Sequence, residues 1–385
     1  MEKEKNKPQL RLKLIGFILL AVVFGFLAGI SGEFIARFYL SNFAFFRDLY
    51  FTETDNLGQN EIIIREPRKV VVEQSLRLDQ VKNDVQPSIM KIYSKKRTAK
   101  NLLDKILLPE DYLGQAVVLT SDGWLMATKN QLVRPKESLI TGSAQKIYEV
   151  ENVVTDEITK IMFIKINAQN LPVTKLADLE KVTNGEQVVV YNSNLDWLNL
   201  ANIQNKRYKE INYKYDFVSN TQVLDKFILL DKSFTSDFNG TPVFNFQSEL
   251  MGFLTGQDES ISLAIPINYI SPIINQVLKE EPIKRPYLGI NYIDLSKAYG
   301  LEDIERQQAN QGALLWPNER GIAIMSDSPL YNKLAKGDII ISVENQTLDA
   351  NNDLTDLLLQ YKSGQDIRIK YWHQQKEAEL NLTLK

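Results

Sequence analysis

The sequence contains no cysteine and a single histidine, His373, among its 385 residues. The absence of cysteine excludes disulfide bridges, a cysteine nucleophile and thiolate metal sites. One histidine does not supply the imidazole ligands that a protein-built zinc site usually needs, so we expect no metal and no cofactor. His373 lies near the C-terminus, and no other residue offers an imidazole that could act as a general base near neutral pH.

The chain also lacks an excess of basic residues. Its formal net charge is −3, with 45 lysines and arginines against 48 acidic residues. Nucleic-acid-binding domains usually show a basic excess, so no nucleic-acid partner is expected. Hydrophobic residues make up 44% of the sequence, which is enough for two or three domains with buried cores.

The N-terminal region joins a basic segment to a long uncharged run. Residues 1–13 are basic, and no charged residue occurs from Leu14 to Ile30. The sequence therefore predicts a cytoplasmic tail over 1–13 and a membrane-spanning helix over 14–40, from Leu14 to Leu40, with the bulk of the chain outside the cytoplasm. A cleaved signal peptide is the alternative, although the apolar core is longer than such peptides usually carry. Residues 41–80 are expected to form a linker or oligomerisation segment.

Short strand patterns dominate the centre of the chain. Residues 114–133 contain two apolar runs separated by the turn residues Ser121, Asp122 and Gly123, which predicts a β-hairpin. Further strands are expected over 147–154 and 161–166. Strands that recur every 8 to 12 residues or so favour an all-β barrel over an alternating βαβ sheet.

The order of these segments resembles the HtrA/Deg branch of the trypsin-like serine proteases. The resemblance rests on the hairpin at 114–133, on 161–190, where the family has D-L-A-V-L-K-I followed by N-L-P-V-A-K-L-G-D-S and L-x-V-G-E-x-V, and on 251–268, where it has G-I-G-F-A-I-P-I-N. It implies an all-β fold: a chymotrypsin/trypsin-like double β-barrel over 81–282, then a β-rich PDZ domain with two helices over 283–385. A helix from Ser271 to Lys279 is expected to join them.

The resemblance also shows which residues occupy the positions of the family's catalytic triad. Gln131 stands where the family has its histidine, Lys160 where it has its aspartate, and Asn239 where it has its serine. An amide cannot take up a proton as imidazole does, and Asn239 carries no nucleophilic oxygen. We therefore expect no catalytic residues and a pseudoprotease.

The oxyanion loop departs from the family pattern as well. The segment Asp237-Phe238-Asn239-Gly240-Thr241 stands where the family has Gly-Asn-Ser-Gly-Gly, so only Gly240 is retained. Side chains at Asp237 and Thr241 restrict the backbone, and Asp237 adds negative charge where an anion would form. The alternative is an active serine endopeptidase of envelope protein quality control that uses Ser236 or Thr241 with Lys160 as the base. Asp156 and Glu157 are expected to be solvated turn residues.

Residues near the C-terminus resemble a PDZ domain of the HtrA type. The marks are Tyr287-Leu288-Gly289-Ile290, which matches the family's carboxylate-binding loop, and the segment from Lys336 to Val343. A short helix from Ser328, a second helix over 354–361 and a final hairpin around His373 are expected. The resemblance implies that Tyr287, Leu288, Gly289 and Ile290 bind C-terminal peptides, which join the domain as an extra strand. A groove that is filled or autoinhibited is the alternative.

These observations together predict a membrane-anchored, extracytoplasmic HtrA-like pseudoprotease. We expect it to bind peptides or unfolded-protein segments through its PDZ domain and to act as a scaffold or regulator. The family's assembly mode suggests a homotrimer, or a hetero-oligomer with an active paralogue. Its expected location is the cell membrane, with a single span.

Overall fold

The computed structural model describes residues 20–29, 31–32, 67–96, 101–132, 134–142, 144–258, 261–307 and 309–385. The chain divides into two units, Met1–Val71 and Val72–Lys385, and each is described by itself. In the first unit, residues 20–29 and 31–32 are helical. Within the described ranges, no helix has both the length and the apolar character needed to cross a membrane. Most of the predicted span over 14–40 lies outside the described residues.

Helix α3 (Pro67–Val85) leads into the barrels. The expected linker or oligomerisation segment over 41–80 is helical over 67–80. Val81 and Val85 are 2% exposed and belong to the main hydrophobic core. Val85 follows Val81 by four positions, so both lie on one face of the helix. Burial of that face stabilises a helix whose valine-rich start has little helical propensity of its own.

The first barrel is closed, with strand order β1-β2-β3-β6-β5-β4. Its strands are β1 (Ile89–Ser94), β2 (Tyr112–Val118), β3 (Trp124–Thr128), β4 (Ser138–Thr141), β5 (Ile147–Thr155) and β6 (Ile161–Ile166). The predicted hairpin is confirmed, since β2 and β3 pair antiparallel with Val117 opposite Met126. Its interior side chains include Leu125, Ile140 and Ile164, all 0% exposed.

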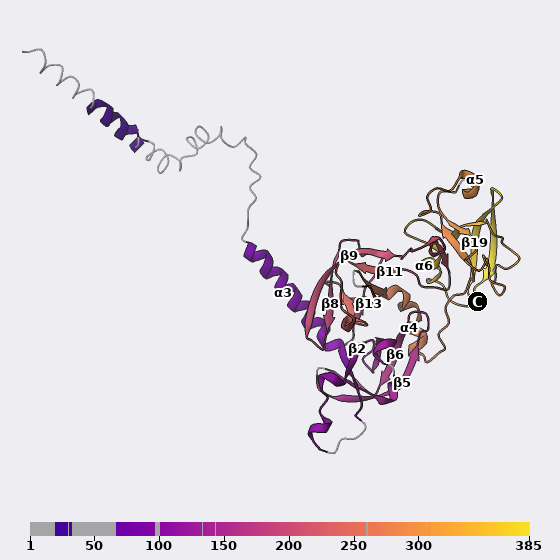
Figure 1. The fold of residues 1–385 in the computed structure, drawn as a ribbon, viewed down its shortest axis with the longest axis horizontal. Helices are drawn as coiled ribbons and strands as arrows, with labels where there is room; N and C mark the ends of the chain where they lie inside the picture. The colour runs from indigo at the N-terminus through magenta and orange to yellow at the C-terminus, as the bar shows by residue number, and fades with distance from the viewer. Residues whose placement is uncertain are drawn as a thin grey trace, which may run out of the picture. The chain divides into compact units, whose positions relative to one another are not determined.

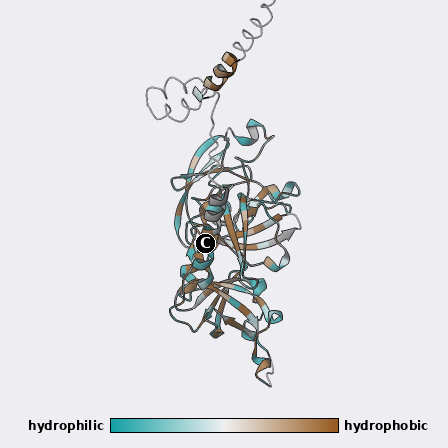
Figure 2. Cartoon of the chain, turned by 90° about the vertical axis from the view of Figure 1, so that its left-hand side faces the viewer, coloured by the Kyte–Doolittle hydropathy of each residue, from teal (hydrophilic) through white to brown (hydrophobic). Residues whose placement is uncertain are grey.

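The second barrel has the strand order β12-β8-β9-β11-β14-β13-β7, and β12 also pairs with β13. Its strands are β7 (Lys175–Leu176), β8 (Gln187–Asn192), β9 (Trp197–Tyr208), β11 (Phe227–Leu230), β12 (Pro242–Phe244), β13 (Glu249–Asp258) and β14 (Ile261–Pro266). Figure 1 labels β8, β9, β11 and β13 of this barrel, and Figure 2 shows hydrophobic residues along the barrel strands. The all-β double barrel is confirmed.

Helix α4 (Ser271–Leu278) follows the second barrel, as predicted, with Pro272 in its first turn. The C-terminal domain contains β15 (Asn291–Asp294), α5 (Asp303–Arg306), β16 (Ala313–Leu315), β17 (Ile339–Val343), β18 (Gln346–Thr347), α6 (Leu354–Leu358), β19 (Asp366–His373) and β20 (Lys376–Thr383). The helix expected from Ser328 is instead a run of turns, in which Tyr331 N–H donates to the Ser328 carbonyl. Pro329 cannot donate a backbone hydrogen bond there.

One strand of the C-terminal sheet comes from another part of the chain. β10 (Val218–Asn220) lies in the segment between β9 and β11, yet it pairs with β15 and forms the edge of the sheet β10-β15-β16-β17-β19-β20. The sequence analysis did not predict this strand. The shorter 3₁₀ helices are η2 (Gln86–Ser88), η3 (Leu103–Lys105), η4 (Pro109–Asp111), η5 (Lys129–Gln131), η6 (Pro135–Glu137), η7 (Lys214–Phe217), η8 (Ser236–Phe238) and η9 (Ile267–Tyr269).

Candidate functional site

Gln131 and Asn239 come from different barrels and meet in the structure. Gln131 ends η5, directly after β3, and is only 6% exposed. Asn239 follows η8, before β12. The Gln131 Nε2 donates to the Asn239 backbone carbonyl at 3.0 Å. This bond commits the amide of Gln131 to holding the loop that contains Asn239.

Lys160 lines a cavity together with Asn239, but its ammonium group pairs with a neighbouring acidic residue. Lys160 and Asn239 both line a cavity of about 220 Å³. The Lys160 ammonium lies 2.8 Å from Glu157, with 58% of the lysine side chain exposed, and Lys129 approaches Glu157 to 3.2 Å. The cavity therefore brings Lys160 close to Asn239, and Gln131 reaches the same loop through its hydrogen bond to the Asn239 carbonyl.

Three acceptor oxygens near this cleft are buried. They are Thr128 Oγ1, Gln131 Oε1 and Asn239 Oδ1, and none has a hydrogen-bond partner among the described residues. A buried amide or hydroxyl oxygen that accepts no hydrogen bond contributes no stabilisation from hydrogen bonding. These three oxygens can accept a hydrogen bond and so orient a hydrogen-bond donor. They cannot attack a carbonyl, because none is an ionisable nucleophile beside a base.

Asp156 is a structural residue, which corrects the expectation that it is a solvated turn residue. Its side chain is 3% exposed and lies 2.5 Å from Arg285, which precedes the C-terminal domain. It also accepts hydrogen bonds from the Thr159 N–H and hydroxyl, at 3.1 and 2.5 Å. Burial alone would raise the pKa of Asp156, but Arg285 and the Thr159 donors outweigh burial and hold it below its ordinary value. Glu157 is exposed, as expected.

Replacing Asp156 with asparagine is expected to lower the free energy of unfolding at pH 7 by about 3 to 5 kcal/mol, because Arg285 would remain buried without its counter-ion. A carboxyl with a depressed folded pKa contributes stability above its unfolded pKa, and this is lost as the pH falls through the folded value. The difference between wild type and Asp156→Asn should therefore shrink below about pH 4. Urea unfolding at pH 7 and pH 3 measures it.

Glu157→Gln is the matched control, because Glu157 is 64% exposed and its ion pairs are solvated. We expect a change below about 1 kcal/mol. Equal losses for the two variants at pH 7 would contradict the structural role of Asp156.

Three consecutive backbone N–H groups of the oxyanion loop donate hydrogen bonds within the protein. Phe238 N–H donates to the Thr235 carbonyl, Asn239 N–H to the Ser236 carbonyl and Gly240 N–H to the Leu254 carbonyl. An oxyanion hole needs N–H groups that point at the substrate oxygen. These three N–H groups are already engaged, so the loop presents none of them to a developing anion.

Phe238 stabilises this loop conformation. Its side chain is 6% exposed and packs against Phe234 and Trp197, with ring centroids 5.3 and 6.5 Å away. Asp237 is exposed, so its charge faces solvent. The position that holds a small polar residue in the family thus holds Phe238 here. Packing of its ring favours the loop conformation in which the N–H groups donate within the protein.

Gly240 is required by close packing. Its φ is +77°, and a Cβ at this position would lie 2.3 Å from Thr128 Oγ1 and 2.4 Å from Gln131 Cδ. Gly240→Ala is expected to cost about 2 to 4 kcal/mol of unfolding free energy from overpacking and backbone strain. Gly185→Ala is the control, since Gly185 has φ +88° with nothing within 4 Å of a Cβ, and should cost only about 1 kcal/mol. Equal costs in chemical denaturation would argue against the tight contact.

The alternative catalytic pair finds little support in this geometry. Ser236 begins η8 and is exposed, whereas Thr241 is 1% exposed behind the loop. The Lys160 ammonium lies 2.8 Å from Glu157, and 58% of the lysine side chain is exposed. A lysine acts as a base when it is desolvated, and Lys160 is not.

The predicted carboxylate-binding loop lies at the start of β15. Leu288 and Ile290 are 0% exposed, so their side chains belong to the domain core. Tyr287 hydroxyl donates to Asp327 at 2.5 Å; burial, followed by that hydrogen bond, raises the pKa of Tyr287 to about 12. Gly289 has φ +66°, and a Cβ there would lie 2.7 Å from the Tyr287 hydroxyl. Gly289 therefore packs closely against Tyr287 within this loop.

A buried ionic cluster joins the second barrel to α6. Lys226, just before β11, contacts Asp353, the N-cap of α6, and lies 3.6 Å from Asp356. Arg207 approaches Asp356 to 3.8 Å, and the Tyr269 hydroxyl donates to Asp356 at 3.0 Å. Lys226 and Asp353 side chains are 5% and 3% exposed. The cluster was not predicted from the sequence, because Lys226 and Asp353 lie far apart in the chain and no motif marks them.

The charges of this cluster shift the pKa values of its own members. Burial would lower the pKa of Lys226, but the charges of Asp356 and Asp353, among others, raise it well above its ordinary value. Burial would likewise raise the pKa of Asp353, and Lys226 holds it below its ordinary value. The pair is therefore ionised at neutral pH.

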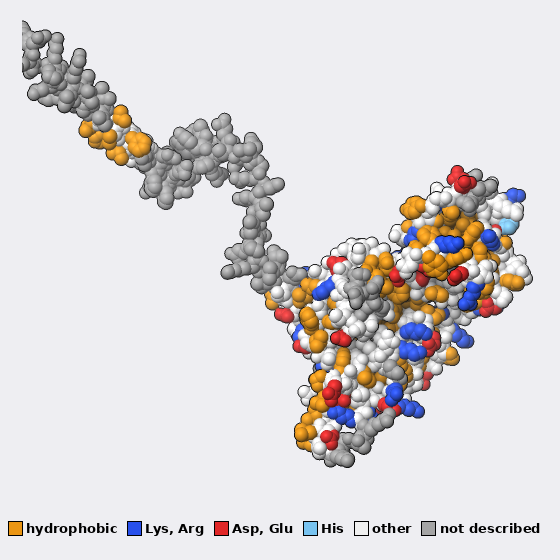
Figure 3. Space-filling model, in the orientation of Figure 1, with side chains coloured by type: hydrophobic (Ala, Val, Ile, Leu, Met, Phe, Trp, Pro, Cys, Tyr) orange, Lys and Arg blue, Asp and Glu red, His pale blue; other side chains and the backbone are white. Residues whose placement is uncertain are grey.

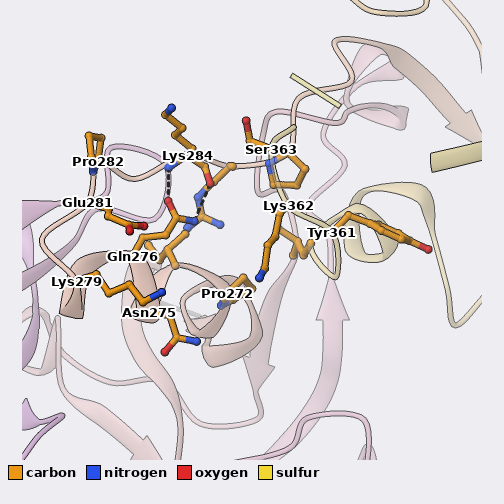
Figure 4. Close-up of a pocket in the computed structure, with 14 residues that line it drawn as sticks. Pro272, Asn275, Gln276, Lys279, Glu281, Pro282, Lys284, Tyr361, Lys362 and Ser363 are labelled. Carbon is orange, nitrogen blue, oxygen red and sulfur yellow. Dashed lines mark hydrogen bonds between the residues drawn. The ribbon is translucent and has the colours of Figure 1, made fainter. Parts of the chain in front are cut away.

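A separate cavity of about 610 Å³ lies between α4, the segment that leads to the C-terminal domain and the end of α6. Figure 4 shows Lys279, Lys284 and Lys362 around it, and Gln276 hydrogen-bonded to the backbone of Lys284. It does not include the triad positions. Within the described part of the chain, no cluster of acidic, histidine or cysteine side chains could hold a metal ion.

Comparison with known families identifies the C-terminal domain. A family model for the PDZ domain matches residues 286–384. The curated relatives include a probable periplasmic serine endoprotease DegP-like from Pseudomonas putida (strain W619), 25% identical over 285 residues, which are 71% of this chain and 55% of the relative. A protein of the same description from Rickettsia prowazekii (strain Madrid E) is 21% identical over 279 residues, 70% of this chain and 52% of the relative. The chain thus spans about half the length of the curated relatives it matches.

Solved structures share the fold. One described as HtrA-type protease AlgW with decapeptide matches with a TM-score of 0.56 and 16% identity, over 80% of this chain and 97% of that one. A second, HtrA-type protease AlgW with tripeptide, matches with a TM-score of 0.56 and 16% identity, over 80% of this chain and 96% of that one. These matches support the arrangement of two barrels followed by a PDZ domain.

Proposed function

Because the chain belongs to the HtrA/Deg family, whose trypsin-like double barrel precedes a PDZ domain, we propose that it is a pseudoprotease that recognises peptide or unfolded-protein segments without cleaving them. The observation that carries this proposal is that Gln131 and Lys160 lie near Asn239, the first bonded to its carbonyl and the second lining one cavity with it. In the proposal these three residues replace the base, the acid and the nucleophile. The engaged N–H groups of the oxyanion loop support it further.

Peptide recognition is assigned to the PDZ domain through Tyr287, Leu288, Gly289 and Ile290. The relatives' description as periplasmic supports an extracytoplasmic location. The titles of the AlgW structures report bound peptides for that protein, which supports the same ligand class here. A membrane anchor over 14–40 and a homotrimer, or a hetero-oligomer with an active paralogue, complete the proposal as a scaffold or regulator. An active protease that uses Lys160 with Ser236 is the second candidate.

Peptide recognition predicts a dependence on the terminal carboxylate. Fluorescent peptides with a free C-terminus should bind the full chain at least about tenfold more tightly than the same peptides with an amidated C-terminus, because the loop N–H groups can bind an anion. Fluorescence anisotropy measures the two affinities. If no peptide in a C-terminal library shows this preference, the assignment to the PDZ domain is wrong.

A further inference from the structure

The edge of the PDZ sheet where a peptide would add as a strand is already paired. β10 runs antiparallel to β15, with Val218 opposite Ile293, Ser219 opposite Tyr292 and Asn220 opposite Asn291. Strand addition to an exposed sheet edge is a general mode of peptide recognition. Here a segment of the same chain, between β9 and β11, occupies that edge.

The next residue, Thr221, reaches the carboxylate-binding loop. Its N–H donates to the Ile290 carbonyl at 3.1 Å, and its Oγ1 accepts from the Ile290 N–H at 3.3 Å. Ile290 is the last residue of that loop. A side-chain oxygen of Thr221 therefore accepts a hydrogen bond that a C-terminal carboxylate oxygen could accept.

The side chains of this segment are buried and hydrogen-bonded to the protein, as those of a bound ligand would be. Ser219 and Thr221 are 5% and 8% exposed. The Ser219 hydroxyl accepts from Lys209 at 2.8 Å and donates to Asp225 at 3.2 Å, while the Asn220 amide donates to Asn291 at 2.8 Å. The polar groups of these side chains thus have partners inside the protein.

Contacts on both sides hold the segment in place. Before it, Phe217 packs against a small cluster that includes Leu314 and Ile339 of the PDZ sheet. After it, Lys226 contacts Asp353 at the start of α6. Figure 3 shows hydrophobic side chains gathered on the side of the PDZ domain that is turned toward the viewer. The segment is therefore anchored to β15 along its length and to α6 just beyond it.

We propose that Val218–Thr221 is an internal ligand of the PDZ domain and that a C-terminal peptide binds by displacing it. The inference rests on the proposed function, because the competing partner is the peptide assigned to the same loop. When the binding-competent state is only fractionally populated, the apparent affinity falls by that fraction. Weakening the internal strand should therefore strengthen peptide binding.

The test uses the full chain and a fluorescein-labelled peptide that ends in Phe-Val-Ser-Asn-Thr with a free carboxylate, which copies residues 217–221. The variant Val218→Gly/Thr221→Ala removes a β-branched strand residue and the hydroxyl that Ile290 N–H contacts. Val223→Gly is the matched control, because Val223 lies beyond the strand and is 52% exposed. We expect the double variant to bind the peptide about tenfold more tightly than wild type, and the control to bind like wild type.

Amide hydrogen exchange of residues 218–221 distinguishes failure of this inference from failure of the proposed function. In wild type these amides should be protected, and both the peptide and the double substitution should reduce the protection. Unprotected amides in wild type, or equal peptide affinities for wild type and the double variant, would overturn the internal ligand. Protected amides in wild type that the double substitution exposes, without peptide binding by either protein, would support the internal strand and refute peptide recognition.

Discussion

The intact chain is expected to hydrolyse casein about 10⁶-fold more slowly than an active serine protease, since loss of a complete triad has an effect of this size. Gln131 cannot accept the proton, Asn239 cannot attack the carbonyl and Lys160 cannot orient a base. Fluorophosphonate labelling and casein hydrolysis by the purified chain measure the residual activity. Labelling that disappears in Ser236→Ala would instead establish the second candidate function.

Restoring the triad should not restore activity. The triple variant Gln131→His/Lys160→Asp/Asn239→Ser supplies base, acid and nucleophile, but the loop N–H groups still donate to Thr235, Ser236 and Leu254 carbonyls. Each missing oxyanion donor costs about 10² to 10³ in turnover. We therefore expect hydrolysis by the triple variant to stay at least about 10⁴-fold below that of an active serine protease. Activity that rises a thousandfold would show that the loop opens readily, and that the substituted triad alone keeps the chain silent.

Replacing Lys226 with methionine is expected to lower the free energy of unfolding by about 3 to 5 kcal/mol, the usual effect of removing one partner of a buried ion pair. Asp353 and Asp356 would lose the cation between them, and Arg207 would remain 3.8 Å from Asp356. Chemical denaturation followed by circular dichroism measures the loss. Lys181→Met is the control, because Lys181 is 84% exposed in a surface pair and should change stability by less than about 1 kcal/mol.

A double-mutant cycle separates the ion pair from the loss of packing. Asp353→Asn keeps an N-cap that can accept from the Asp356 N–H while it removes the charge. Lys226→Met/Asp353→Asn should therefore lose less than the sum of the two single losses, by about 1 to 3 kcal/mol. Additive losses would show that Lys226 and Asp353 stabilise the fold independently.

The sequence predicted what depends on local patterns and on chain order. Alternating apolar residues and the turn at Asp122 predicted the β2–β3 hairpin, and Pro272 with spaced apolar residues predicted α4. The fold class and the PDZ domain followed from the order of such segments. The assignment of Gln131 and Asn239 to the family's catalytic positions came from their flanking strands, and it stays a prediction.

The sequence by itself determined which chemical groups stand at positions 131, 160 and 239, because side-chain chemistry is a local property. Tertiary structure alone decided which of them are engaged: the Gln131 amide holds the Asn239 carbonyl, Asp156 is buried against Arg285, and Lys226 is buried against α6. It also placed Val218–Asn220 on the PDZ edge. These contacts join residues far apart in the chain. Their energies depend on burial and on the partner brought into contact, neither of which a local pattern records.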